Sequence, residues 1–362
     1  MEKKKIIWIT EDSFIDVDMG IIPSLRRSFD IYWIVIMQWQ TNRELPGNDI
    51  VNEVVRLKGR KRSLSTLSIF YNLIKKVKDN NPDLIYLDIQ GAPYFYPLVF
   101  RFLDVNKVIY LAHNIEPRPA WNRVDKLFIP YMLRRLKYVH AISSQYNDYL
   151  DGHYPNLNYY NIPMPIKSFG EPDVSHIHNK VRFLFFGHVA VNKRLDKLIS
   201  AYKMLPKELQ DKSELYVYGK CPEPYKYYEM TKGNEHIFLN FGFVKDKDIP
   251  HIFSSVSFLV LPYDDVSQSG PSMIAYNYNV PLICTDLPGF KEIVENGKTG
   301  FLYETNDTAS LEKTLEKCIE LTNQEYETMK VNLKKYVDSN YTLAVLTQRY
   351  ANMFNDIMKS KL

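Results

Sequence analysis

Two successive series of apolar runs, separated by amphipathic stretches, constrain the fold of this sequence more than any other feature. Short runs rich in Ile, Val, Tyr and Phe are typical of buried strands. Amphipathic segments such as 65–81 lie between them and end in basic and turn residues, as helices do. The first series is 4–10, 31–36, 83–88, 107–113 and 138–143, and the second is 181–187, 214–219, 236–242, 257–263 and 280–286. This alternation predicts α/β architecture with parallel sheets.

The length of 362 residues is too great for one ordinary core, so the two series predict two domains. A content of 45% apolar and 24% charged residues is that of a globular chain. No apolar run approaches the roughly 18 residues of a membrane span, and "MEKKKIIWIT" predicts a first strand, not a signal peptide. The three cysteines, Cys221, Cys284 and Cys318, fit a reducing cytoplasm and match no zinc-ligand spacing.

Positive charge is concentrated in the first half. Residues 1–167 hold 23 Lys and Arg against 17 Asp and Glu, whereas the remainder holds 23 against 25. This excess suggests an anionic partner for the first domain. The segment 57–76 and the segment 132–139 join basic residues to apolar helical stripes, a pattern that suits peripheral contact with an anionic membrane. The aromatic residues fall at core spacing, which argues against nucleic acid as a partner.

Ligands of open α/β sheets gather beyond the carboxyl ends of the strands. That rule selects Gly20, His113, Gly187, Gly219, Gly242 and the loop 263–271. Each domain is therefore expected to hold one substrate at its strand ends.

Four stretches of the second half together resemble the donor-binding half of glycosyltransferase family 4: "FLFFGHVAVNKRLDKLISAY", "LYVYGK", "FLNFGFVKDKDIPHIFSSVSFLVLPYDD" and "NVPLICTDLPGFKEIVENGKTGFLY". The resemblance covers about residues 180–305. It implies the GT-B fold, in which two Rossmann-like domains with parallel sheets face each other across a cleft. It also implies transfer of a sugar from a nucleotide-diphosphate sugar with retention of configuration, without a metal or other cofactor. "DVD" at 16–18 and "DKD" at 246–248 do not fit a metal site.

The resemblance also sets the expected domains. Residues 1–167 would form the acceptor-binding domain, 168–179 a linker and 180–342 the donor-binding domain, with a C-terminal helix of about 343–362 packing back on the first domain. The acceptor would be a glycan or lipid-linked glycan, as in bacterial cell-surface polysaccharide biosynthesis. We expect a cytoplasmic enzyme that can work at the inner face of the cell membrane.

The family's phosphate-binding motif is only partly present. Gly187 and Lys193 match it, but His188 replaces an arginine and Arg194 replaces a glycine. The resemblance implies that Lys193 stabilises the charge of the leaving diphosphate, with His188 or Arg194 supplying the missing positive charge. Gly20 and Gly219 are expected where the backbone approaches the donor.

The family's two glutamates are absent, and Val266 and Ile274 stand in their places. The sequence resembles a branch that carries "QSG" instead. The donor loop would then consist of Gln268, Ser269, Gly270, Pro271 and Ser272, a helix start able to hold phosphate. Asp265 or its neighbour Asp264 would replace the lost carboxylate at the sugar, a choice that the sequence leaves open.

Two further residues follow from the resemblance. His113 is expected to contact the transferred sugar or the acceptor hydroxyl, and Glu292 either binds a sugar hydroxyl or caps a helix. Two other functions remain open: a nucleotide-sugar epimerase of the same fold, and a catalytically inactive regulatory subunit that binds nucleotide-sugars.

Overall fold

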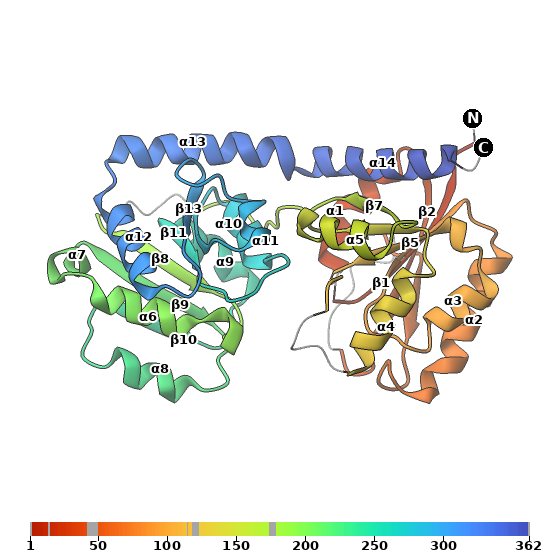
Figure 1. Cartoon of the computed structure of the whole chain (residues 1–362), viewed down its shortest axis with the longest axis horizontal. Helices are drawn as coiled ribbons and strands as arrows, with labels where there is room; N and C mark the ends of the chain where they lie inside the picture. Colours follow the sequence, from red (N-terminus) through yellow and green to blue (C-terminus); the bar gives the residue numbers. More distant parts are fainter. Residues whose placement is uncertain are drawn as a thin grey trace. The chain divides into compact units, whose positions relative to one another are not determined.

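The computed structural model divides the chain into two compact units (Figure 1). Unit 1 comprises Met1–Met164 with Leu343–Leu362, and unit 2 comprises Pro165–Thr342. The structure describes residues 2–13, 15–41, 50–113, 115–117, 123–173 and 179–360. Residues 174–178 of the expected linker lie outside the described residues. Each unit contains one parallel sheet with helices, which confirms the predicted α/β fold with two Rossmann-like domains.

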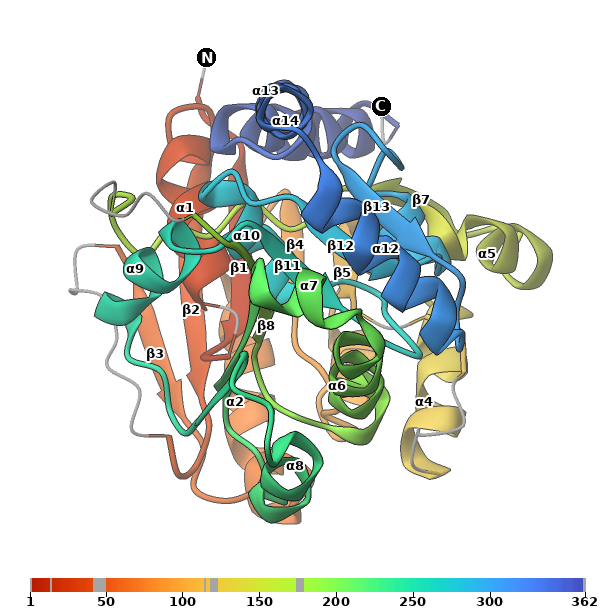
Figure 2. The ribbon, with the colours of Figure 1, turned by 90° about the vertical axis from the view of Figure 1, so that its left-hand side faces the viewer.

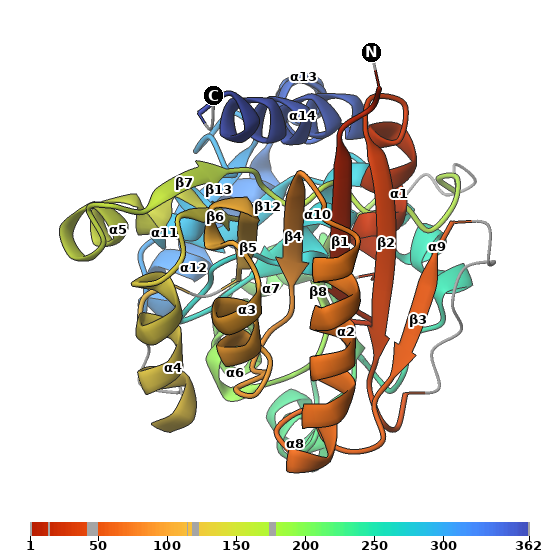
Figure 3. The ribbon, with the colours of Figure 1, turned by 90° about the vertical axis from the view of Figure 1, so that its right-hand side faces the viewer.

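Unit 1 is built on a seven-stranded parallel sheet in the order β3-β2-β1-β4-β5-β6-β7 (Figure 3). Its strands are β1 (Lys5–Glu11), β2 (Asp30–Met37), β3 (Glu53–Arg56), β4 (Leu84–Asp88), β5 (Val108–Ala112), β6 (Tyr138–Ala141) and β7 (Asn158–Asn161). Its helices are α1 (Ile15–Leu25), α2 (Leu67–Asp79), α3 (Tyr96–Phe102), α4 (Arg123–Leu133), α5 (Asn147–His153) and α14 (Leu343–Lys359).

The two faces of this sheet carry separate cores, because successive side chains of a strand point to opposite faces. Ile7 and Ile9 of β1 belong to the core that α2 and α3 cover. Trp8, between them, belongs to the core formed with α1 and α14. There its ring centroid lies 5.6 Å from that of Tyr350 and 6.1 Å from that of Phe354. The last helix of the chain therefore completes the core of the first unit.

Unit 2 has a six-stranded parallel sheet in the order β10-β9-β8-β11-β12-β13 (Figure 2). Its strands are β8 (Val181–Phe186), β9 (Ser213–Gly219), β10 (Ile237–Phe241), β11 (Phe258–Leu261), β12 (Leu282–Thr285) and β13 (Gly300–Tyr303). Its helices are α6 (Leu195–Met204), α7 (Lys207–Asp211), α8 (Pro224–Thr231), α9 (Ile249–Ser254), α10 (Gly270–Asn277), α11 (Pro288–Lys291), α12 (Thr308–Glu320) and α13 (Asn323–Asn340). Helices α6 and α12 pack side by side, and α10 packs against α13.

Local capping explains where several of these helices begin. Asp307 accepts hydrogen bonds from the amides of Ala309 and Ser310 at the start of α12. Thr322 and Glu325 form a reciprocal capping box that starts α13. Among the described residues, no helix is both long enough and apolar enough to traverse a bilayer.

Candidate functional site

Two glycines bring the strand ends of unit 2 together. Gly187 follows β8 and Gly219 ends β9, and their φ angles are 121° and 143°. A Cβ atom on Gly219 would lie 1.8 Å from the Gly187 carbonyl oxygen, so only glycine fits there. A Cβ atom on Gly187 would lie 3.5 Å from Cγ of Pro271, in the first turn of α10. The ends of β8 and β9 and the start of α10 therefore meet at one edge of the sheet.

Lys193 projects into this edge from a short 3₁₀ turn, Val191–Lys193. Its Nζ lies 3.5 Å from the ring centroid of Tyr263, a buried residue of the loop after β11. Burial lowers the pKa of Lys193 to about 8, against the opposing negative charge of Asp265. The ammonium group is thus partly desolvated and has the ring of Tyr263 as its close contact. A desolvated cation of this kind attracts an incoming anion strongly.

Arg194 has the backbone conformation of a glycine and a guanidinium that is already paired. Its φ of 47° and ψ of 43° are left-handed, which costs a non-glycine residue about 1 kcal/mol. Its guanidinium lies 3.0 Å from Asp196 and 2.9 Å from Asp264, and Lys197 lies 3.4 Å from the same Asp264. These ion pairs fix the left-handed turn and tie it to the loop after β11.

The two aspartates of that loop, Asp264 and Asp265, differ in their partners and in their exposure. Asp264 is held by Arg194 and Lys197, and its backbone amide donates to the carbonyl of Asn192. Asp265 is exposed, and its charge acts on Lys193. Asp265 is therefore the more accessible of the two carboxylates.

Helix α10 begins as the sequence predicts, with Ser269 at the N-cap and Pro271 in the first turn. Ser269 makes no side-chain capping bond. Its buried hydroxyl lies beside that of Tyr263 without a well-formed hydrogen bond. The amide of exposed Gly270 has no hydrogen-bond partner among the residues that the structure describes. An uncapped helix start of this kind favours an anion.

The remaining residues of the donor loop, and the two positions where glutamates are expected, differ in burial. Ser272 is fully buried, and its hydroxyl donates to the Ser269 carbonyl at 2.5 Å, so it is not presented to a ligand. Gln268 is half-buried. Val266 and Ile274, which stand where glutamates are expected, are each 6% exposed and belong to the core.

A hollow of about 460 Å³ opens beside the Lys193 turn. His188 is exposed at its wall, and Arg194, Asp196 and Lys226 line it together with Cys221. Its volume is within the range of small-molecule sites. Among the described residues, no group of three or more His, Cys, Asp or Glu side chains is arranged to hold a metal ion.

In unit 1, His113 lies just beyond the carboxyl end of β5 and is joined to Asp88 at the end of β4. The His113 Nε2 atom is 2.9 Å from Asp88 Oδ1, and the two side chains are 15% and 2% exposed. The sequence indicates Asp88 only as the last residue of the run 83–88. Its partnership with His113 depends on β4 and β5 being neighbours, which the sequence does not specify.

A second buried pair lies at the same edge. Glu11, at the end of β1, accepts from Lys61 Nζ at 2.7 Å and from the amide of Gln90 at 2.6 Å. Burial raises the pKa of Glu11, although the ion pair with Lys61 opposes the shift. Gln90 also donates to the carbonyl of Leu111 at 2.8 Å, which links β1, β4 and β5. Sequence reasoning missed Glu11, Lys61 and Gln90 because each is recognisable only through its partners.

The structure corrects the expected position of Gly20 and shows where Asp18 and Glu292 lie. Gly20 lies within helix α1, not in a loop, and a Cβ atom there would lie 3.5 Å from Leu343 of α14. Asp18 also lies in α1, where burial, with the nearby charge of Asp88, raises its pKa. Glu292 follows α11, and its carbonyl accepts from the Tyr336 hydroxyl at 2.6 Å.

The chain matches a known family over its second unit. Residues 171–336 match the family model described as glycosyl transferases group 1. An uncharacterised 41.2 kDa protein of the cps region of Klebsiella pneumoniae is 24% identical over 268 residues, which are 68% of this chain and 72% of that protein. A capsular polysaccharide biosynthesis glycosyltransferase of Staphylococcus aureus is 24% identical over 182 residues, which are 48% of this chain and 46% of that protein.

Solved structures resemble the whole chain in fold. Sucrose-phosphate synthase from Thermosynechococcus elongatus has a TM-score of 0.80 at 13% identity, covering 99% of this chain and 100% of that one. HepE of Anabaena in complex with UDP-glucose has a TM-score of 0.73 at 15% identity, covering 97% and 99%. The family match and these folds together support a GT-B glycosyltransferase.

Proposed function

We propose that the chain transfers a sugar from a nucleoside-diphosphate sugar held by unit 2 to a glycan or lipid-linked glycan held by unit 1, with retention of configuration. The observation that carries the proposal is the partly desolvated Lys193 at the same sheet edge as the open start of α10. Both supply positive potential where a diphosphate would sit. The UDP-glucose bound to HepE and the capsular role of the S. aureus relative agree with this assignment.

In the proposed reaction, the bond between the sugar C1 and the diphosphate oxygen breaks while the acceptor oxygen bonds to C1 on the same face. The acceptor hydroxyl gives its proton to the departing phosphate oxygen. Lys193 and the amide of Gly270 hold the phosphate as its charge increases, a contribution of about 3 kcal/mol for one such donor. Asp265 is the proposed partner of the sugar, since it is the more exposed of the two aspartates. Lys193 and the helix start supply the counter-charge, so we propose transfer without a metal.

Transfer from radiolabelled nucleoside-diphosphate sugars to a panel of glycan acceptors tests the proposal. Lys193→Ala is expected to abolish transfer while the protein stays folded. Turnover close to that of the wild type in this variant would contradict it. The same assay separates the alternatives, because an epimerase converts donor without acceptor, and an inactive subunit binds nucleotide without releasing sugar.

We propose further that unit 1 contacts the cytoplasmic face of the cell membrane. Leu64, Leu67 and Tyr71 are exposed by 70%, 41% and 45%, and they lie near the start of α2, among the basic residues of 57–76. Exposed apolar groups flanked by lysines suit an anionic bilayer. Flotation with vesicles rich in phosphatidylglycerol tests this. The double variant Leu64→Ser, Leu67→Ser should no longer float with the vesicles, whereas unchanged flotation of this variant would count against the membrane contact.

A further inference from the structure

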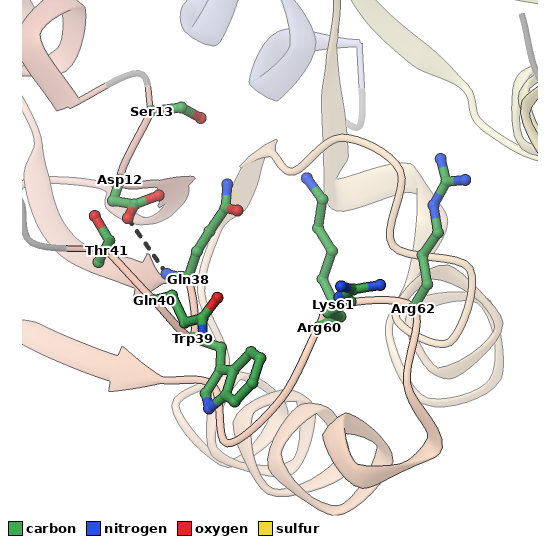
Figure 4. A pocket seen from close by; sticks show the side chains of 9 residues that line it. All are labelled: Asp12, Ser13, Gln38, Trp39, Gln40, Thr41, Arg60, Lys61 and Arg62. Atoms are coloured by element: carbon green, nitrogen blue, oxygen red, sulfur yellow. Dashed lines mark hydrogen bonds between the residues drawn. The ribbon is translucent and has the colours of Figure 1, made fainter.

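A hollow of about 560 Å³ opens at the carboxyl ends of β1 and β2 in unit 1 (Figure 4). The segment 38–41 after β2 forms one side, and the segment 60–62 after β3 forms the other. Asp12, just after β1, forms part of the wall and accepts from the amide of Gln38 at 3.3 Å. All these lining residues lie in unit 1, outside the donor site described above.

The hollow presents an exposed indole. Trp39 is 50% exposed, whereas Trp8 and Trp33 are fully buried. Figure 4 shows the indole on the side of segment 38–41, with the amide of Gln40 next to it and Arg60 opposite. An indole face packs well on the apolar C–H face of a sugar ring, and the neighbouring amide suits sugar hydroxyls.

The opposite wall carries three successive cations, of which two are already paired. Lys61 pairs with buried Glu11, and Arg62 pairs with Asp125 at 2.8 Å. The guanidinium of exposed Arg60 has no ion pair or hydrogen bond with any residue in the described part of the chain. An unpaired guanidinium on the wall opposite an indole is suited to hold the planar or tetrahedral anion of a ligand whose ring packs on that indole.

We propose that this hollow binds an acidic sugar unit of a saccharide, with its ring on Trp39 and its carboxylate or phosphate on Arg60. The assignment rests on the proposed function, because it makes this sugar part of the acceptor. Acceptors whose sugar at this subsite is neutral would leave Arg60 without an ionic partner and bind more weakly.

The hollow is linked to the candidate catalytic histidine through the sheet edge. Lys61 of its wall bonds Glu11, and Glu11 accepts from Gln90. Gln90 follows β4 two residues after Asp88, which bonds His113. A saccharide seated on Trp39 would therefore occupy the same edge of the unit 1 sheet as His113.

Titration calorimetry of the full-length chain without donor tests the proposal. Three trisaccharides are compared at low salt: one ending in glucuronate, one ending in a sugar 6-phosphate and one ending in neutral glucose. At least one acidic trisaccharide should bind about tenfold more tightly than the neutral one, as expected for a hydrogen-bonded charge pair. The stronger of the two acidic ligands identifies carboxylate or phosphate as the natural anion.

Matched variants show which residues produce the preference for acidic trisaccharides. Arg60→Gln should remove the acidic preference, and Trp39→Ala should weaken all three ligands. Lys58→Gln removes the same charge two residues away, outside the hollow, and should keep the preference. Absence of binding, equal affinity for acidic and neutral ligands, or a preference that survives Arg60→Gln would overturn the inference.

The transfer assay distinguishes this failure from failure of the proposed function. Transfer to neutral and acidic acceptors at equal rates, unaffected by Arg60→Gln, would overturn only the inference. Acidic binding that depends on Arg60, with no transfer from any donor, would sustain the inference as a saccharide site and overturn the proposed function.

Discussion

The Nε2 atom of His113 lies 2.9 Å from Oδ1 of Asp88, on neighbouring strands of the unit 1 sheet. Asp88 is 2% exposed and His113 is 15% exposed, so the buried carboxylate can fix the orientation of the imidazole at the edge of the sheet. Asp88 is therefore a positioning residue for His113.

Asp88→Asn should lower the turnover number by about tenfold to hundredfold with little change in the KM for the donor, because it disturbs the orientation of a group that acts during transfer. Steady-state kinetics of the variant give the two constants separately. His153→Ala, which removes an exposed histidine of α5, serves as the control and should change neither. A rise in donor KM at constant turnover would argue against the positioning role.

Lys193→Met should reduce transfer by about 10²-fold to 10³-fold, as expected for loss of one charge-stabilising donor. It should not lower the midpoint of urea unfolding at pH 7. The pKa of Lys193 is lower in the folded protein than in the unfolded chain, so protonation of this lysine favours unfolding. Stability is therefore lost as the pH falls through about 8, and at pH 7 the charged Lys193 already lowers the free energy of unfolding. Lys313→Met, at an exposed site on α12, is the control.

Affinity for a nucleoside diphosphate should decline as the pH rises above about 8, because Lys193 then loses the proton that attracts the phosphate. Calorimetric titration of UDP between pH 6.5 and 9.5 measures this; UDP is chosen because the structurally similar HepE of Anabaena has been solved with UDP-glucose. The decline should approach about tenfold per pH unit. Lys193→Met should bind weakly with little of this dependence; an equally steep decline in that variant would assign the titration to another group.

Arg194→Gly should be more stable than Arg194→Ala by about 1 kcal/mol. Both variants lose the ion pairs with Asp196 and Asp264, but only glycine accepts a φ of 47° without strain. The difference in free energy of unfolding in urea isolates the backbone term. A more stable alanine variant would show that the turn relaxes when its ion pairs are removed.

Gly219→Ala should destabilise unit 2 by more than Gly233→Ala. Both glycines have positive φ, 143° and 77°, but only at Gly219 does an added Cβ atom meet the backbone, 1.8 Å from the Gly187 carbonyl. At Gly233 nothing lies within 4 Å, so about 1 kcal/mol of backbone strain is the expected cost. The melting temperatures of the two variants measure this difference, because Gly233→Ala introduces backbone strain alone and Gly219→Ala adds a steric clash. Equal losses would mean that the loop after β8 moves aside.

The sequence predicts the central strands well and misses three at sheet edges. The ten runs that it identifies correspond to strands. Nine of them are internal, where burial requires nearly continuous apolar residues, and the tenth, β10, is an edge strand. The missed strands are β3, β7 and β13, with the sequences EVVR, NYYN and GFLY. Each is short and lies at the edge of its sheet, where one side is not paired with another strand and polar residues are tolerated.

The candidate site was predictable where it depends on local order in the chain. A helix start with Pro271 in its first turn follows from the serine–glycine–proline sequence, and the structure confirms it and assigns the N-cap to Ser269. The ion pair of Arg194 with Asp264 and the partners of His113 and Lys61 join residues 25 to 70 apart, which lie on strands or loops whose neighbours the sequence does not specify. Gly20 was expected in a loop because the resemblance places a glycine there after the first strand, whereas it lies within α1, next to Leu343 of α14.

The packing of α14 on unit 1 has a consequence for biosynthesis. Tyr350 and Phe354, which cover Trp8 and Tyr86, leave the ribosome about 340 residues after β1. Until then the aromatic face of the first sheet lacks its cover, while Pro165–Thr342 already contains every element of unit 2. The second unit can thus mature first during translation, and the nascent first unit offers its uncovered apolar face to chaperones until α14 has been synthesised.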